Sequence, residues 1–557
     1  MNYIFSSAQR HAYLQQMQQA SIDLLVIGGG ITGAGIALDA QSRGMQTALL
    51  EMQDFAAGTS SRSTKLVHGG LRYLKQFEFG LVAEVGRERA IVYENGPHVT
   101  KAEPMLLPLV KGGTLGKLGA SVGLSLYDTL AGVKSKERRL MLNAAETLSR
   151  EPLLRKDGLL GGAYYYEYRT DDARLTIEIL KEAVQRGALA LNYINVTGFT
   201  YTDGRITGVK AEDQLTGRTL QIAAKKVVNA TGPWVDALDG INDSTKGNKL
   251  HITKGVHIVV DYQKFPLKQA VYFDTPDRRM IFAIPRDGKT YIGTTDTTYT
   301  GDLVHPQITE ADISYLIQAA GYMFPQSALE RQDIESSWVG LRPLIRQPGK
   351  GPTDISRKDE IFQYESGLIT IAGGKLTGYR KMAERVVNVL AKAFQKEEGR
   401  SFPACFTDRI SVSGGQVGGS AGYGAFVKQK TEAGIKLGLP AEEASRLTHR
   451  YGSNVDKIFE RVASSESKTS GLPAVLLAQL LYSMEEEMAA TPTDFFIRRT
   501  GALYFNIQWV QQWQQAVIHY MADYFHWDDP TTARHQQTLQ NRIREAKGEA
   551  VALQTTV

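Results

Sequence analysis

The chain has 557 residues, and its 64 Lys and Arg exceed its 59 Asp and Glu by five, so it is mildly basic. This length predicts two to four domains, and the 42% hydrophobic and 22% charged residues are typical of an ordinary globular protein. The charge is too low and too dispersed for a nucleic-acid-binding protein. Cys405 is the only cysteine, which excludes intramolecular disulfides and cysteine metal clusters, so we expect a reducing, cytosolic location and no metal site.

Residues 1–21 are polar and rich in glutamine, and they predict a leading helix. An apolar run at residues 24–27 then predicts a buried strand. Gly28, Gly30 and Gly33 follow it in G-x-G-x-x-G spacing, and apolar residues recur after them at helical spacing. These glycines would allow a tight turn, a close approach to a pyrophosphate and close packing of helix on strand.

A second strand ends at Glu51, which is placed to accept a hydrogen bond from a ribose hydroxyl. The helix N-terminus after Gly30 would attract the phosphates. The unit as a whole therefore predicts a bound dinucleotide, and the alternative is a glycine-rich turn in an unoccupied α/β fold.

The next segments are a loop, a helix and an unusual apolar stretch. Residues 58–74 place small hydroxyl residues and glycines around Lys65, His68 and Arg72. This composition favours a surface pressed against a phosphate or a heterocycle, with an ordinary capped loop as the alternative. Residues 75–103 predict a helix.

The stretch 106–133 is apolar and bordered by six basic residues. Its least polar part is too short to span a bilayer comfortably as a helix. We expect the stretch either to lie in the membrane interface or to form a buried pair of helices.

The middle of the chain alternates between strands and turns. A strand at 164–168 leads to a helix that Thr170 or Asp171 could cap. Further strands are predicted at 189–202, 206–212 and 220–223.

Two later strands end in small residues or glycines. One begins at Lys226 and ends in Ala230-Thr231-Gly232, which suggests that the chain returns beside the dinucleotide. After a strand-rich region at 250–300, the stretch 368–380 repeats the order strand, glycines, helix, so a second helix N-terminus can point at the ligand. From about Pro403 onward, long helical patterns replace the strands.

Nine ordered segments together closely resemble the FAD-dependent glycerol-3-phosphate dehydrogenases over nearly the whole chain. They are IGGGITGAGIALDA, SSRSTKLVHGGLRYL, RTDDARL, VVNATGPWV, KGVHIVV, YIGTTDTTYTGD, GLRPL, ISRKDE and IAGGKLTGYRK. The resemblance implies an α/β fold of the D-amino-acid-oxidase-like superfamily: a Rossmann-like FAD-binding domain, an antiparallel-sheet substrate (cap) domain and an all-α C-terminal domain. We assign residues 1–100, 160–250 and 335–395 to the first, 101–159 and 251–334 to the second, and 400–557 to the third.

The resemblance also implies an activity and partners. The expected reaction is oxidation of sn-glycerol 3-phosphate to dihydroxyacetone phosphate, with the electrons passed through FAD to membrane quinone. The enzyme would be cytoplasmic and attach peripherally to the inner face of the cell membrane, and a homodimer is one candidate for its oligomeric state.

Three alternatives stay open. One is an oxidase that takes the same substrate and reduces oxygen to peroxide; such relatives carry an extra insertion before the helical domain, and none is obvious here. Another is an amine or amino-acid oxidase of the same superfamily, in which GLRPL would hold a carboxylate. The last is a flavin-binding protein without catalytic activity.

The family motifs carry the candidate site residues over to this sequence. The cofactor-binding candidates are Gly28, Gly30, Gly33, Glu51, Thr59, Ser60, Lys65, Leu66, His68, Gly69, Val196, Ala230, Gly232, Trp234, Gly340, Gly373, Gly374, Lys375, Leu376 and Thr377. The substrate-binding candidates are His68, Arg72, Tyr73, Arg342, Arg357 and Lys375.

Two of these residues fit the chemistry of the expected reaction. Arg342 lies between Gly340 and Pro343, and its guanidinium fork can bind a phosphate through two donors, although a surface ion pair is the commoner role. A neutral histidine suits the removal of the C2 hydroxyl proton near pH 7, and His257 is our candidate, with His68 as the alternative. Arg342 would also stabilise the developing alkoxide. The nearby Arg346 has no assigned role: it extends the phosphate pocket or faces solvent.

Overall fold

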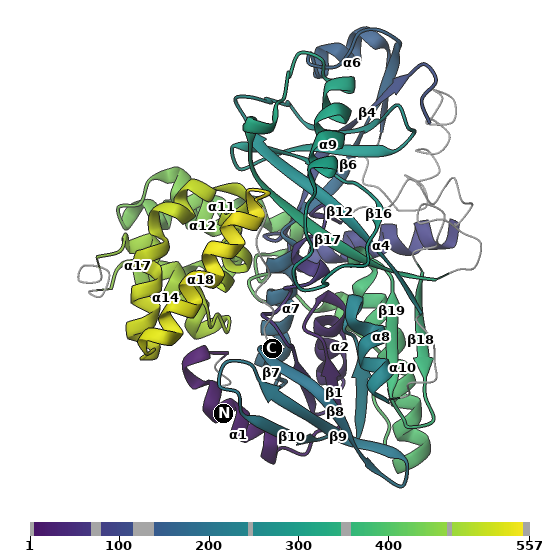
Figure 1. Cartoon of the computed structure of the whole chain (residues 1–557), viewed down its shortest axis with the longest axis vertical. Coiled ribbons are helices and arrows are strands. Elements are labelled where there is room, and N and C mark those ends of the chain that lie inside the picture. The colour runs from purple at the N-terminus through teal and green to yellow at the C-terminus, as the bar shows by residue number, and fades with distance from the viewer. Residues whose placement is uncertain are drawn as a thin grey trace.

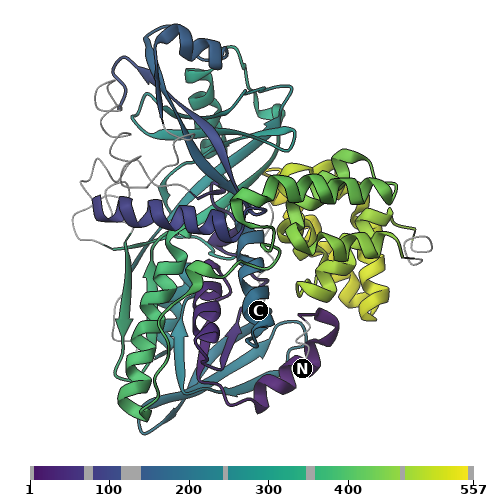
Figure 2. The ribbon, with the colours of Figure 1, turned by 180° about the vertical axis from the view of Figure 1, so that it is seen from behind.

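The structure is a computed structural model that describes residues 5–67, 79–114, 139–242, 249–346, 358–464 and 471–549. Figures 1 and 2 show three parts: a sheet with helices at the bottom, a second sheet above it, and a group of helices at one side. The fold class expected from the sequence, α/β with a helical C-terminal domain, is confirmed.

The first sheet has six strands in the order β18-β19-β11-β1-β2-β7. All are parallel except β18, which runs antiparallel at the edge. Their bounds are β1 Leu24–Ile27, β2 Thr47–Leu50, β7 Leu189–Leu191, β11 Lys226–Asn229, β18 Asp359–Gln363 and β19 Ile369–Gly373. A three-stranded antiparallel sheet contacts it, made of β8 Ile194–Thr202, β9 Arg205–Asp213 and β10 Thr219–Ala223.

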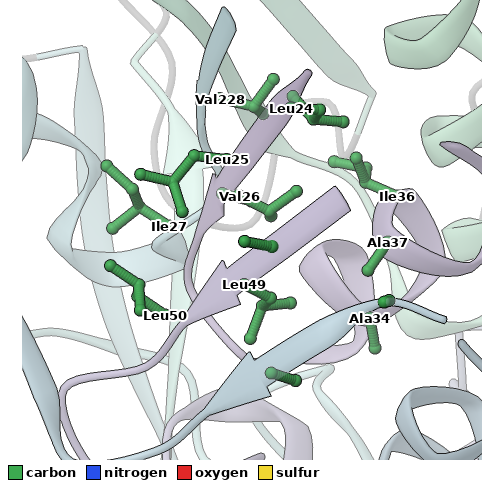
Figure 3. Close-up of a cluster of buried hydrophobic side chains, with 14 of the residues drawn as sticks. Leu24, Leu25, Val26, Ile27, Ala34, Ile36, Ala37, Leu49, Leu50 and Val228 are labelled. Carbon is green, nitrogen blue, oxygen red and sulfur yellow. The ribbon is translucent and has the colours of Figure 1, made fainter. Parts of the chain in front are cut away.

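The helix α2 (Ile31–Ser42) lies beside the first sheet and packs against both α7 (Asp172–Gln185) and α10 (Tyr379–Glu398). The apolar run of β1 is buried along its whole length, as expected for a central parallel strand covered on both faces. Figure 3 shows its side chains packed with those of α2 and β2. The predicted strand–helix–strand unit is therefore confirmed.

The second sheet has ten strands, in the order β16-β12-β15-β14-β13-β4-β6-β3, with β17 paired to β12 and β5 to β6. Their bounds are β3 Leu66–Val67, β4 Thr100–Val110, β5 Leu140–Leu142, β6 Leu159–Thr170, β12 Leu250–Asp261, β13 Ala270–Asp274, β14 Met280–Arg286, β15 Lys289–Gly293, β16 Thr297–Thr298 and β17 Ile334–Ile345.

Strand β12 divides its side chains between the two faces of this sheet, because alternate residues of a strand point to opposite sides. Val256 and Ile258 pack with the helix α9 (Glu310–Met323) on one face. Val259 packs with helices of the C-terminal part on the other face. His257 is two residues from Val259, so it lies on the face that looks away from α9.

The C-terminal part is helical, as predicted. It comprises α11 Gly419–Lys436, α12 Ala441–Tyr451, α13 Val455–Val462, α14 Ala474–Glu486, α15 Pro492–Asp494, the single π-turn η10 Phe495–Arg499, α16 Ala502–Phe505, α17 Ile507–Phe525 and α18 Asp529–Ala546. The remaining helices are α1 Arg10–Gln19, α4 Phe79–Asn95, α6 Ala144–Arg150 and α8 Val235–Asn242, with short 3₁₀ turns that include η2 Thr59–Ser61, η4 Gly232–Trp234 and η6 Leu376–Gly378. Among the described residues, no helix is both long and apolar enough to cross a bilayer.

Buried ion pairs join the helical part to the first sheet. Arg498 and Arg499 of the π-turn both bind Asp54, which follows β2, and neighbouring positive charge lowers the pKa of Asp54 to about 2. Arg174 of α7 binds Glu487. Removing one partner of such a pair leaves an unpaired buried charge, which costs roughly 3–5 kcal/mol. These contacts therefore fix how the helical part docks.

Two expectations need correction. The helix expected over 75–103 ends at Asn95, and β4 takes up the chain from Thr100. Leu106, Leu107 and Leu109 of the apolar stretch 106–133 are buried in β4, so neither the interfacial nor the helix-pair interpretation holds there. Residues 115–133 of the stretch lie outside the described residues.

Three strands in the segments that we assigned to the FAD-binding domain belong to the second sheet. They are β3, which pairs with β6, β6, which also pairs with β4, and β17, which pairs with β12. The domain boundaries themselves stay a prediction.

Candidate active site

One cavity of about 870 Å³ connects the first sheet to the second. Its volume lies in the upper part of the range typical of cofactor and ligand sites. The first sheet and the turn after β1 contribute residues 27, 28, 30–32 and 230–234, and the glycine strand contributes residues 373–377. The second sheet contributes His257, residues 294–296 and residues 340–344.

The glycine turn after β1 forms one end of this cavity. Gly28 has φ +112°, which favours glycine, and a Cβ at this position would overlap the carbonyl of Ala230 on the neighbouring strand. A Cβ on Gly33 would overlap the Gly28 carbonyl oxygen, so α2 can approach the turn only because neither residue has a side chain. No side chain at the N-cap Gly30 caps α2, and Ser60 Oγ accepts from the Ile31 N–H at 2.9 Å.

This end of the cavity fits a dinucleotide. The first turn of α2 presents N–H groups and the positive end of the helix dipole. Gly30 lines the wall, and a Cβ there would project to within 3.1 Å of Ser60 Oγ, into the space beside the turn. The cradle is therefore open for a pyrophosphate.

Glu51 lies at the end of β2 in the cavity wall, where the sequence predicted a ribose acceptor. Its carboxylate accepts from the backbone N–H of Gly29 at 2.7 Å and of Gln53 at 2.9 Å. Burial raises the pKa of Glu51 in spite of these hydrogen bonds. The two backbone donors therefore hold the carboxylate beside the glycine turn.

The second glycine strand reaches the cavity from the other side. Gly373 ends β19 with φ +74° and Gly374 follows with φ +79°, and the two glycines turn the chain so that Lys375, Leu376 and Thr377 line the wall. The helix α10 begins two residues later, so its N-terminus also lies near the cavity. This agrees with the expectation that a second helix N-terminus faces the ligand.

His257 is buried in the wall formed by the second sheet and is 1% exposed. Its Nε2 lies 3.0 Å from Thr64 Oγ1, and its ring stacks on Trp338 at 4.7 Å between centroids. Burial lowers the pKa of His257 well below 6.5, and the charges of Arg342 and Lys65 lower it further. The imidazole is therefore neutral at pH 7 and can accept a proton.

Arg342 lies beside His257 on the same face of the sheet. Its Nη1 donates to Asp296 at 3.0 Å and to the Thr295 carbonyl at 3.2 Å, and its Nη2 donates to Thr294 Oγ1 at 3.0 Å. These contacts fix the guanidinium plane against the cavity, as a bidentate anion site requires.

Three glycines on neighbouring strands leave the space that these groups occupy. Gly293 pairs directly with His257, and Gly255 pairs with Gly340. A Cβ on Gly293 would overlap the His257 ring, and one on Gly255 would overlap the Arg342 guanidinium. A Cβ on Gly340 would overlap the carbonyl oxygen of the loop residue Arg62. These glycines form a flat floor that lets bulky polar groups lie against the sheet.

The structure brings most predicted site residues to this cavity. Those that line it are Gly28, Gly30, Glu51, Thr59, Ser60, Leu66, Val196, Ala230, Gly232, Trp234, His257, Gly340, Arg342, Gly373, Gly374, Lys375, Leu376 and Thr377. Gly33 supports the turn from behind. His68, Gly69, Arg72, Tyr73 and Arg357 lie outside the described residues.

Two residues do not reach the cavity wall. Lys65, which we predicted to bind the cofactor, does not line the cavity: it is buried and binds Asp172 at 2.6 Å. Its ammonium needs that carboxylate where water is excluded. Arg346 is exposed and donates only to the Leu250 carbonyl, at 3.4 Å, among the described contacts of its side chain. Of the two roles left open for Arg346, the structure favours the surface one.

The sequence analysis missed residues that hold the predicted ones in place. Thr64 and Trp338 contact His257, whereas Thr294 and Asp296 hold Arg342. Thr294 and Asp296 lie in the segment YIGTTD, which we used for the resemblance without giving its residues a role. Trp338 carries no local signal, because only the pairing of β12 with β17 places it beside His257.

We expect Gly30→Val to empty the cofactor site, because the isopropyl group would fill the space beside Ser60 into which the pyrophosphate must fit. The FAD released on denaturation should fall from near one per chain to near zero. Gly321→Val in α9 is a control, since a Cβ there meets no atom within 4 Å. Undiminished FAD content in Gly30→Val would contradict the cradle.

Two family models match the chain. The model described as FAD dependent oxidoreductase matches residues 23–380. The model described as the C-terminal domain of alpha-glycerophosphate oxidase matches residues 405–532. The first match covers both sheets and every described residue of the candidate site.

Similar proteins align over nearly the full chain. An aerobic glycerol-3-phosphate dehydrogenase of Bacillus subtilis is 58% identical, and the match covers 98% of this chain and 99% of that protein. A protein of the same name from Staphylococcus epidermidis is 53% identical, with 97% and 98% covered. The crystal structure of glycerol-3-phosphate dehydrogenase from Bacillus halodurans complexed with FAD has a TM-score of 0.86 at 51% identity and covers 99% of this chain and 100% of that one.

Proposed function

The chain belongs to the family of FAD-dependent oxidoreductases, and on that premise we propose that it oxidises sn-glycerol 3-phosphate to dihydroxyacetone phosphate. One observation supports this most strongly. A single cavity joins a dinucleotide cradle to a neutral, buried His257 and a fixed Arg342. This arrangement suits a phosphorylated alcohol that must lose a hydride and a proton together.

FAD, His257 and Arg342 have separate roles in this reaction. FAD, when bound, supplies the two-electron acceptor for the hydride of C2. The Nε2 atom of His257 takes the C2 hydroxyl proton while the C–O bond becomes a carbonyl, so the alcohol loses two electrons and two hydrogens in all. Arg342 binds the phosphate and holds the substrate so that C2 is fixed relative to His257.

The environment of His257 keeps the ring in the neutral form that a general base requires. Burial lowers the pKa of His257, and the charges of Arg342 and Lys65 lower it further. The stacking of Trp338 and the floor at Gly293 keep the imidazole in one orientation. Orientation of this kind is a large part of what a general base contributes.

We further propose that the electrons pass to membrane quinone and that the enzyme attaches peripherally to the inner face of the cell membrane. Two considerations support this. The similar proteins are named dehydrogenases rather than oxidases, and a quinone dissolves in the lipid, so its reductase must reach the membrane surface.

The direct test is anaerobic mixing of the FAD-loaded protein with sn-glycerol 3-phosphate while the flavin absorbance is recorded. We expect the oxidised flavin band to bleach. Plain glycerol at the same concentration should leave it unchanged, because it offers Arg342 no phosphate. Equal bleaching by both alcohols would contradict a phosphate-directed site.

The same experiment separates the alternatives. Bleaching by amino acids but not by glycerol 3-phosphate would show an amino-acid oxidase. A flavin that no reductant bleaches would show a binding protein without catalysis. Rapid reoxidation by air without quinone would favour the oxidase over the dehydrogenase.

A further inference from the structure

The loop of residues 51–58, which leads from β2 to the turn η2, lies partly in the cavity wall and partly behind it. Its ends, residues 51–52 and residue 58, line the cavity. Its middle, residues 54–56, is buried outside the cavity wall. The loop therefore connects the dinucleotide cradle with the part of the protein that packs behind it.

The middle of this loop supports the glycine turn from behind. The Ala56 N–H donates to the Gly29 carbonyl at 3.0 Å. A Cβ on Gly29 would lie 2.7 Å from the Phe55 ring and 2.9 Å from the Glu51 side chain, so Gly29 packs closely between the two. Ala56 has φ +62°, a conformation that a residue with a side chain keeps only where its surroundings impose it. The positions of Gly29 and Glu51 therefore depend on how residues 54–56 are held.

The helical C-terminal part holds the loop through Asp54. The Asp54 carboxylate accepts from Arg498 Nε and, at 2.7 and 2.9 Å, from the two terminal nitrogens of Arg499. Asn192 donates to the same carboxylate at 3.0 Å, and it lies two residues before the cavity residue Ile194. These donors come from the π-turn η10 and from the strand end beside Glu51, so Asp54 joins the helical part to the cradle.

The link from Asp54 to the ribose acceptor Glu51 is geometric rather than electrostatic. The charge of Asp54 raises the pKa of Glu51 and the charge of Arg498 lowers it, so the two charges oppose each other there. The connection through the chain is short, because Asp54 is three residues from Glu51 and two from Ala56. What Asp54 controls is therefore where the loop places the ribose acceptor and the glycine turn.

We propose that Asp54 is a positioning residue for the cofactor: it binds η10, and the docked helical part thereby holds residues 51–58 in the conformation that retains FAD. FAD binding and docking of the helical part are then coupled. Such coupling is reciprocal, so FAD stabilises the docked helical part by the same free energy. The proposal concerns only the cofactor, so a failure of glycerol 3-phosphate to reduce the flavin would leave it intact.

The first test measures how fast the holoenzyme releases FAD. Asp54→Asn removes the carboxylate charge, whereas Arg499→Lys keeps its charge but loses the two-pronged contact with Asp54. Arg174→Lys is the matched control, because it makes the same change in a buried ion pair of the same interface, with Glu487, and leaves the Asp54 contact in place. Release is followed by the rise in flavin fluorescence after dilution, and melting temperatures are measured on the same preparations.

We expect Asp54→Asn and Arg499→Lys to release FAD about 5- to 150-fold faster than the wild type, the usual range of coupling between two sites. Arg174→Lys should lower the melting temperature without a comparable change in release. If Asp54→Asn does not fold, Arg499→Lys decides the question alone. Unchanged release by folded Arg499→Lys, or release that is equally fast in Arg174→Lys, would overturn the proposal.

The second test examines the reciprocity, which a purely structural ion pair would not show. Amide hydrogen exchange at residues 495–499 is compared between the holoenzyme and protein from which FAD has been removed. We expect FAD to slow this exchange in the wild type and to slow it less in Arg499→Lys, with residues 313–320 of α9 as the internal control. Equal exchange at residues 495–499 with and without FAD in the wild type would overturn the proposal.

Discussion

His257→Ala is expected to slow flavin reduction by glycerol 3-phosphate by about 10²–10⁴-fold, the usual contribution of a positioned general base. Substrate binding should weaken much less, because Arg342 and the rest of the wall remain. Single-turnover reduction under anaerobic conditions measures the chemical step directly. His251→Ala is the matched control, since His251 lies on the same strand β12 but binds Thr298 at its exposed end.

The pH profile of the wild type provides a further check of this role. The pKa of His257 is lowered, so the neutral ring persists as pH falls below 6.5 and the base is lost only at a lower pH. The acid limb of the reduction rate should therefore lie below pH 6.5 and vanish in His257→Ala. Fast reduction in this variant would instead move the base to His68 or to solvent.

Arg342→Ala is expected to lower kcat/KM for glycerol 3-phosphate by about 30- to 1000-fold. The reason is the loss of a charge-assisted, two-pronged contact, which is worth roughly 2–4 kcal/mol. Arg342→Lys should recover little of the lost kcat/KM. A lysine ammonium cannot donate at once to a phosphate in the cavity, to Asp296 and to Thr294, as the guanidinium fork does.

The control for this variant is Arg346→Ala, four residues further along the chain. Arg346 is exposed and does not line the cavity, so its removal should change kcat/KM by less than a factor of about three. A decrease below threefold in Arg342→Ala, or an equal decrease in both variants, would show that the phosphate is bound elsewhere.

Local patterns in the sequence were sufficient for the dinucleotide end of the site. Three features each lie at the end of a strand that the pattern of apolar residues reveals: the turn at Gly28, the acid Glu51 and the glycines that begin at Gly373. Their spacing is set by the geometry of one strand–helix–strand unit, so it is visible in a short stretch of chain. The family motifs then supplied His257 and Arg342.

What could not be predicted depends on pairing between distant strands. Trp338 lies beside His257, and Arg62 lies over Gly340, only because β17 pairs with β12 and the loop after η2 lies across it. The strand β4 was missed for a related reason. Leu106 and its neighbours have the composition of an apolar helix, and burial against β6 and α6 decides their conformation rather than their own periodicity.

The strand order of the first sheet bears on how the enzyme is made in the cell. β1 leaves the ribosome early, but it lies between β2 and β11, and β11 in turn needs β19. At ~5–20 residues per second, roughly 20–70 s of translation separate Ile27 from Ile369. Until β11 is synthesised, one edge of β1 has no permanent neighbour, and until β19 is synthesised the cradle lacks a wall. We therefore expect FAD to be loaded after synthesis of the sheet is complete and chaperones to protect the chain until then.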